Sequence, residues 1–305
     1  MPARPSNLTL WVAAVLIMLG AGSWQRMTGP TKPIRGTLEG AEGPVRYALI
    51  RSEETVRPAR IALPDPGPGA SGSVWYRRYP TGEPFTRVDL QKETLDGRTE
   101  LVAYVPAQPA AGKVEYRVEL EADGQVQRIP SPGQLDGDTI VMRFKDPIPL
   151  GLLIAHVTFM ALAVLVGMRA GLGALFNPSK VQGLSWIALG LMSVGGMILG
   201  PIVQKYAFGA YWTGFPWGYD LTDNKTLIMW LVWILACGVL GWKQRAEIGA
   251  RARAVVVGAA VVMTAVYLIP HSLRGSELDY GQLQDGAQAG RVDRAGGGRL
   301  GVDQA

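Results

Sequence analysis

The chain has 305 residues, of which 48% are hydrophobic, and its formal net charge is +5. A single cysteine, Cys237, excludes an internal disulfide, and the lack of a CxxCH motif excludes covalent attachment of a c-type haem to this chain. The sequence has no Walker motif, no nucleophile–base set and no metal-ligand cluster. Its basic residues are not gathered into a patch typical of nucleic-acid binding.

The chain begins with a short apolar run, Leu8 to Gly22, preceded by Arg4. A run of about fifteen residues is shorter than the about 17–25 residues of an ordinary membrane span. Residues 1–22 are therefore predicted to be either a signal segment or a retained membrane anchor. Both alternatives place the next segment outside the cytoplasm.

Residues 23–45 are rich in Gly, Pro and Thr and are predicted to be a linker. Residues 46–147 then alternate strand-like segments with turn signals such as the Asp-Gly pair at 96–97. About seven short strands in about a hundred residues predict an all-β, antiparallel sandwich. One segment, 113–120, is similar to a late strand of immunoglobulin-like or fibronectin-type domains. Without His or Cys, this domain is interpreted as a binding or spacer domain.

Residues 150–271 are predicted to form an all-α, four-helix transmembrane domain. Its apolar runs are 150–168, 184–203, 226–242 and 254–270. The connections 169–183 and 243–253 are basic, which places them in the cytoplasm under the positive-inside rule. The β-sandwich, the loop 204–225 and a mobile tail, 272–305, then lie on the outer side. The sequence thus predicts a multi-pass protein of a bacterial inner membrane with a periplasmic domain.

The loop 204–225 contains seven aromatic side chains, more than an interfacial belt requires. Gly209, Gly214 and Gly218 allow tight turns within it. An aromatic, glycine-interrupted loop at the membrane surface predicts a binding platform for a large planar ligand. The candidate ligand-binding residues, with Asp220 as the group that orients the loop, are Phe208, Tyr211, Trp212, Trp217, Tyr219 and Asp220.

The chain has two histidines, and the predicted topology places both on the outer side beside this loop. His156 lies about six residues into the first large span, and His271 lies at the outer end of the last one. An ionisable residue within a span is costly, and neutral imidazole is a common axial ligand of haem iron. For either histidine, the alternative is a hydrogen bond to a neighbouring helix.

Two external histidines that flank a tryptophan-rich loop ending in Asp resemble the plan of the haem-handling membrane proteins of cytochrome c maturation. Those proteins carry a signature close to WGxxWxWD. Residues 208–212, FGAYW, resemble its first half, and residues 217–220, WGYD, resemble its second half. The segment 213–216 is an insertion, two Trp positions hold Phe and Tyr, the family's bundle has more spans, and the β-sandwich is not a standard part of it.

The resemblance implies a non-covalent, b-type haem bound at the outer face, with His156 and His271 as axial ligands of its iron. Aromatic side chains can cover a porphyrin face, and Lys205, Lys225 or Arg274 can pair with its propionates. The implied partners are periplasmic cytochromes or cytochrome-assembly proteins. Two alternatives stay open: an electron-transfer subunit that holds the same haem, and a non-catalytic subunit whose β-sandwich and loop dock partner proteins.

Overall fold

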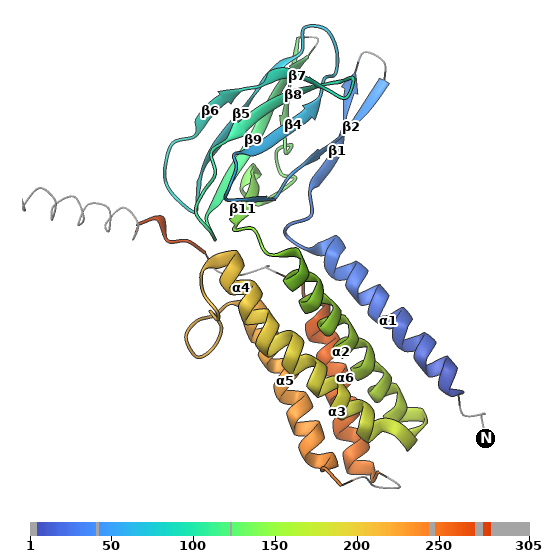
Figure 1. The fold of residues 1–305 in the computed structure, drawn as a ribbon. Helices are drawn as coiled ribbons and strands as arrows, with labels where there is room; N and C mark the ends of the chain where they lie inside the picture. The colour runs from blue at the N-terminus through green and yellow to red at the C-terminus, as the bar shows by residue number, and fades with distance from the viewer. Residues whose placement is uncertain (1–4, 41–42, 123, 244–247, 272–276, 282–305) are drawn as a thin grey trace, which may run out of the picture.

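The computed structural model describes residues 5–40, 43–122, 124–243, 248–271 and 277–281 (Figure 1). Within these ranges the chain has a β-rich region of three sheets and five helices that are long and apolar enough to cross a membrane. Figure 1 shows the β-rich region beyond one end of the helices, with α1 leading into it and α2 leading out of it. These elements indicate a membrane protein.

Helix α1, Asn7–Thr28, is longer than the predicted anchor, residues 1–22. The Ser6 side chain accepts a hydrogen bond from the Thr9 N–H and caps its start, at 3.1 Å. At about 1.5 Å per residue the helix is about 33 Å long, enough for the about 30 Å apolar layer of a membrane. The predicted linker, residues 23–45, instead contains the last turns of α1, a complete strand and the start of a second one.

The β-rich region contains more strands than the sequence predicts. They are β1 (Ile34–Gly40), β2 (Gly43–Leu49), β3 (Ser52–Glu54), β4 (Ala59–Pro64), β5 (Ser71–Tyr79), β6 (Thr86–Asp89), β7 (Gln91–Leu95), β8 (Arg98–Val105), β9 (Lys113–Ala122), β10 (Gln125–Ile129) and β11 (Ile140–Lys145). The sheets are β1-β2, β4-β8-β7, and β3-β11-β9-β5-β6 with β10 beside β9. Neighbouring strands are antiparallel except β3 and β11, which are parallel.

One apolar core joins the three sheets. Alternating side chains of β4 and β9 point into it, and Ile61, Tyr116 and Phe144 are fully buried there. The Tyr116 hydroxyl donates a hydrogen bond to the Ile50 carbonyl at 2.7 Å, so its one polar group is satisfied. The side chains that alternate along the predicted strands therefore do form an apolar core.

The helices that follow are longer than the predicted runs. They are α2 (Leu150–Phe176), α3 (Val181–Met192), α4 (Gly200–Phe208), α5 (Leu221–Leu240) and α6 (Ala250–Leu268). A 3-10 turn, Pro178–Lys180, precedes α3, and a π-helical segment, Ser193–Leu199, connects α3 to α4, so residues 178–208 form one continuous span. A further 3-10 turn, Asp136–Asp138, precedes β11.

Large and small side chains alternate where the helices pack. Trp233 of α5 is fully buried, and its Nε1–H points at the Met263 Sδ of α6 at 3.3 Å. A Cβ at Gly167 of α2 would lie 2.8 Å from the Trp233 ring, so only glycine fits there. Helix α1 joins the predicted four-helix bundle at both ends, because Asn7 Oδ1 accepts from Arg169 and Gln25 donates to the Tyr267 carbonyl (2.6 and 2.9 Å).

A short segment after α6, residues 277–281, lies against the β-rich region. The Tyr280 hydroxyl accepts from the Lys113 N–H at 3.0 Å and donates to the Lys113 carbonyl at 2.9 Å. The Lys113 ammonium also pairs with Glu277. This part of the predicted mobile tail is therefore held in place, and residues 272–276 and 282–305 lie outside the described residues.

Tyr280→Phe is expected to lower the free energy of unfolding by about 1–2 kcal/mol, because it leaves buried backbone groups of Lys113 without a partner. Thermal unfolding of the detergent-purified protein measures this change. Tyr219→Phe removes the same hydroxyl from a side chain that is 94% exposed and serves as the control. Equal melting temperatures for the two variants would show that the segment does not stabilise the fold.

Candidate functional site

A cavity of about 360 Å³ lies at the end of the helices that faces the β-rich region. Its walls come from α2, α4, the start of α5, the chain after α6 and strand β11. We call it the histidine cavity, because both histidines of the chain line it. The other polar and aromatic residues in its wall include Phe208, Trp212, Asp220, Lys225, Arg143 and Lys145.

His156 lies in the second turn of α2, and a hydrogen bond fixes its ring. Its Nδ1 lies 2.9 Å from the carbonyl oxygen of Gly195. A carbonyl can only accept, so Nδ1 carries the hydrogen and, in the neutral ring, Nε2 keeps its lone pair. The alternative that the sequence left open, a hydrogen bond to a neighbouring helix, is therefore present, and it leaves the second nitrogen available.

The Gly195 carbonyl belongs to the π-helical segment Ser193–Leu199, where it also accepts from the Gly200 N–H five residues later. Pro201 explains the wide turn, because proline has no N–H and its ring collides with the preceding helical turn. The segment lies close to α2, since a Cβ at Gly195 would be 2.9 Å from the Phe159 Cβ. Such π-helical turns are frequent at functional sites.

Gly195→Ala is expected to lower the free energy of unfolding by about 1–3 kcal/mol, because the new methyl group meets Phe159 and the backbone of Met160. The π-helical segment must then move away from α2, which lengthens the bond to His156. Gly190→Ala in the same span meets nothing within 4 Å and is the control. Thermal unfolding measures both, and a Gly195→Ala protein as stable as the control would contradict the close contact.

His271 follows the end of α6 and lines the same cavity. His271 is an exposed residue, yet the surrounding protein still disfavours the charged form of its ring. This burial, together with the positive charge of Lys225 and the proximity of His156, lowers the pKa of His271 to about 4, and Asp220 opposes the change. At neutral pH the ring is therefore uncharged, the form in which imidazole binds metals.

The two carboxylates near the end of the loop 204–225 have different roles. Asp220 caps α5 by accepting hydrogen bonds from the Thr222 and Asp223 N–H groups at 2.8 and 3.3 Å. Asp223, only 6% exposed, accepts from the Thr213 N–H at 2.7 Å, and Asn224 accepts from the Phe215 N–H at 2.7 Å. Asp223 and Asn224 thus hold the loop, the role that the sequence assigned to Asp220.

The predicted aromatic platform is divided by the fold. Phe208 and Trp212 line the histidine cavity, whereas Tyr211, Trp217 and Tyr219 do not. Trp217 is 81% exposed, and Figure 1 shows the loop between α4 and α5 projecting away from the helices. Gly209 ends α4 in a left-handed conformation with φ of 83°, which turns the chain outward.

Of the three cations predicted to pair with propionates, Lys225 lines the cavity. It is 3% exposed and donates to the Ile269 carbonyl. Lys205 instead binds the Gly209 carbonyl at 2.6 Å outside the cavity wall, and Arg274 lies outside the described residues.

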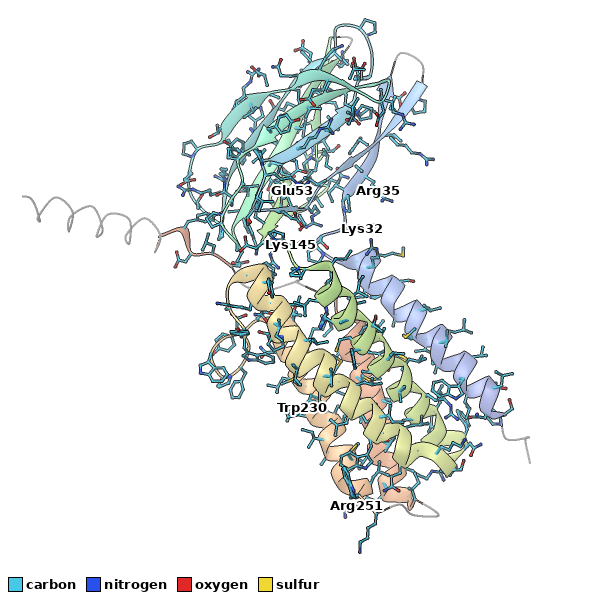
Figure 2. All side chains as sticks on the ribbon, viewed as in Figure 1. Lys32, Arg35, Glu53, Lys145, Trp230 and Arg251 are labelled. Atoms are coloured by element: carbon cyan, nitrogen blue, oxygen red, sulfur yellow. The ribbon has the colours of Figure 1, made fainter. Side chains whose placement is uncertain are left out.

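Strand β11 supplies two cations that the sequence reading missed, Arg143 and Lys145. Figure 2 shows Lys145 at the junction between the β-rich region and the helices. The Arg143 guanidinium lies over the Phe208 ring, 5.6 Å from its centroid. Burial lowers the pKa of Arg143, while the negative charges of Asp220 and Glu277 oppose this. Period-two alternation places Arg143 on the strand face opposite the core residues Met142 and Phe144, but only the folded structure shows that this face meets Phe208.

No family model, curated protein or solved structure matches the chain. Within the part of the chain that the structure describes, no three His, Cys, Asp or Glu side chains group together as a metal-ion site. Interpretation of the histidine cavity therefore depends on its own geometry and chemistry.

Proposed function

We propose that the histidine cavity binds a non-covalent haem at the outer face of the membrane. The observation that carries the proposal is that the two histidines of the chain line one cavity, with His156 oriented through its Nδ1–H. Metal-ligating histidines characteristically donate their other N–H to a carbonyl or carboxylate. A porphyrin supplies four nitrogen ligands itself, so two imidazoles complete the coordination of its iron.

The other residues of the cavity suit the same group. Its volume of about 360 Å³ lies in the range of about 300–1,000 Å³ typical of small-molecule sites. Val157, Met160 and Phe208 offer apolar contacts for the porphyrin faces, and Arg143 and Lys145 offer charge to its propionates. Asp220 is engaged at the N-terminus of α5, which limits its repulsion of those propionates.

We further propose a handling role, as in the haem-handling proteins of cytochrome c maturation, in preference to a sealed electron-transfer site. A bound haem supplies one-electron redox chemistry in either case. The exposed position of His271 after the end of α6 supports handling, because a partner can reach a ligand held there. Periplasmic cytochromes or cytochrome-assembly proteins are the proposed partners. The docking role stays as the alternative for a protein that binds no haem.

We also propose that the β-rich region is an immunoglobulin-like or fibronectin-like sandwich in the periplasm of a bacterium, and that the helices lie in the inner membrane. One core shared by all three sheets supports the sandwich. Figure 2 shows Arg251 at the end of the helices away from the β-rich region. Arg251, Arg253 and Lys180 make that end basic, as the positive-inside rule requires of a cytoplasmic face.

The test is the visible absorption spectrum of the detergent-purified protein, oxidised and reduced, with a pyridine haemochrome assay. About one haem per chain is expected, because the two histidines that line the cavity would hold a single haem iron. A labile or partly occupied haem supports handling, and a stable low-spin haem with reversible redox behaviour supports electron transfer. A protein that stays free of haem when haem is supplied in excess would contradict both and favour the docking role.

A further inference from the structure

A second cavity, of about 450 Å³, lies where α1 leads into β1. We call it the basic cavity, because Arg26, Lys32 and Arg35 line it, and none of the described residues in its wall is acidic. It shares Gln25 and His271 with the histidine cavity. Figure 2 shows Lys32 and Arg35 in the neck between α1 and the β-rich region.

The three cations of the basic cavity lack acidic partners within the described part of the chain. Two arginines of the β-rich region, by contrast, are paired: Arg60 with Glu100 at 2.7 Å and Arg77 with Glu115 at 2.6 Å. Three like charges around one hollow repel one another unless an anion lies between them. The cavity is therefore arranged for a negatively charged ligand.

The position of the basic cavity along α1 indicates the source of that anion. Helix α1 is about as long as the apolar layer is thick, and Arg26 lies in its last turn. Trp24, exposed beside it, is a residue type that marks the level of the lipid headgroups. Gln25 donates to the Tyr267 carbonyl at 2.9 Å, which fixes this end of α1 to α6. The cavity thus opens at headgroup depth beside a fixed wall.

We propose that the basic cavity binds the phosphate group of an anionic phospholipid, and this proposal does not rest on haem in the histidine cavity. The guanidinium groups of Arg26 and Arg35 match two oxygens of a phosphate, and Lys32 adds a point charge. A zwitterionic lipid carries the same phosphate beside an ammonium group, which three cations disfavour. Selectivity for anionic over zwitterionic headgroups follows.

The experiment uses the full chain in detergent, titrated with phosphatidylglycerol, with phosphatidylcholine or with inorganic phosphate, and counts bound lipid by native mass spectrometry. Phosphatidylglycerol is expected to be retained in preference to phosphatidylcholine. In the triple variant Arg26→Gln, Lys32→Gln, Arg35→Gln, its affinity should fall about five-fold for each charge removed, or roughly a hundred-fold in total. The variant Arg26→Lys, Arg35→Lys keeps the charge but loses the two-pronged guanidinium contacts, so its affinity should lie between those of the parent protein and the triple variant.

The control, Arg46→Gln, Lys92→Gln, Arg98→Gln, removes the same formal charge from exposed positions of the β-rich region, where Lys92 pairs with Asp65, and should bind lipid as the parent protein does. Unchanged melting temperatures would confirm that the variants fold. Equal loss in both triple variants would overturn the site, because net charge alone would then explain binding. Displacement of the lipid by millimolar inorganic phosphate would assign the cavity to free phosphate and overturn the lipid proposal.

Discussion

Replacing His156 and His271 together by alanine is expected to abolish haem retention while membrane insertion continues. The cavity keeps its aromatic and cationic walls in this variant, but the iron loses both protein ligands. Each single variant should keep one ligand and shift the bound haem from low spin to high spin. The measurement is haem per chain by the pyridine haemochrome assay, alongside the visible spectrum of membranes and purified protein.

Gln182→Ala is a suitable control for this experiment. Gln182 is a buried polar residue whose amide donates to the Gly241 carbonyl at 2.9 Å, and it does not line the histidine cavity. Its loss perturbs packing and hydrogen bonding to a similar degree without touching the proposed ligands. Haem that persists in the double histidine variant, at the level of the control, would refute the ligand assignment.

Asp223→Ala is expected to release the aromatic loop and to lower the free energy of unfolding by about 2–4 kcal/mol. The carboxylate is buried and holds Thr213, so its removal leaves a donor without a partner. Trp212, which lines the histidine cavity next to Thr213, should then lose its fixed position and haem retention should weaken. Thermal unfolding and near-ultraviolet circular dichroism measure the two effects.

Two further variants define what the Asp223 result means. Asp223→Asn keeps the size of the side chain but removes its charge, so an intermediate loss is expected. Asp89→Ala removes an exposed carboxylate that pairs with Arg87, and it should change stability by less than about 1 kcal/mol. A loop whose dichroism and stability are the same in Asp223→Ala and Asp89→Ala would show that Asp223 does not hold it.

Features with a local cause were predictable from the sequence. Apolar runs predicted membrane-length helices, and period-two alternation predicted the strands that share one core. The two histidines were expected beside the aromatic loop, and the fold brings both into one cavity. Each histidine lies near the outer end of a predicted span. Outer ends of neighbouring spans lie at the same membrane face, so the positions of the two residues along their spans were sufficient for this inference.

Features that depend on distant contacts were not predictable. Arg143 and Lys145 belong to β11, and only the placement of that strand over the helices makes them part of the cavity. The aromatic loop looked like one platform, but the turn at Gly209 and the contacts of Asp223 direct Trp217 and Tyr219 outward. The π-helical segment had a signal in the sequence, the pair Gly195 and Gly196 followed five residues later by Pro201. Its contact with His156 could be seen only in the structure.

The bond between Gln25 and the Tyr267 carbonyl also sets an order of events during biosynthesis. Its partners are 242 residues apart, so at about 5–20 residues per second the ribosome makes the second roughly 10–50 s after the first. In the same way, the hydrogen bond from Lys225 to Ile269 and the one between Lys113 and Tyr280 can form only after the later residue has been made. Tyr267 and His271 line the histidine cavity, so its wall can be complete only after residue 271 has been made.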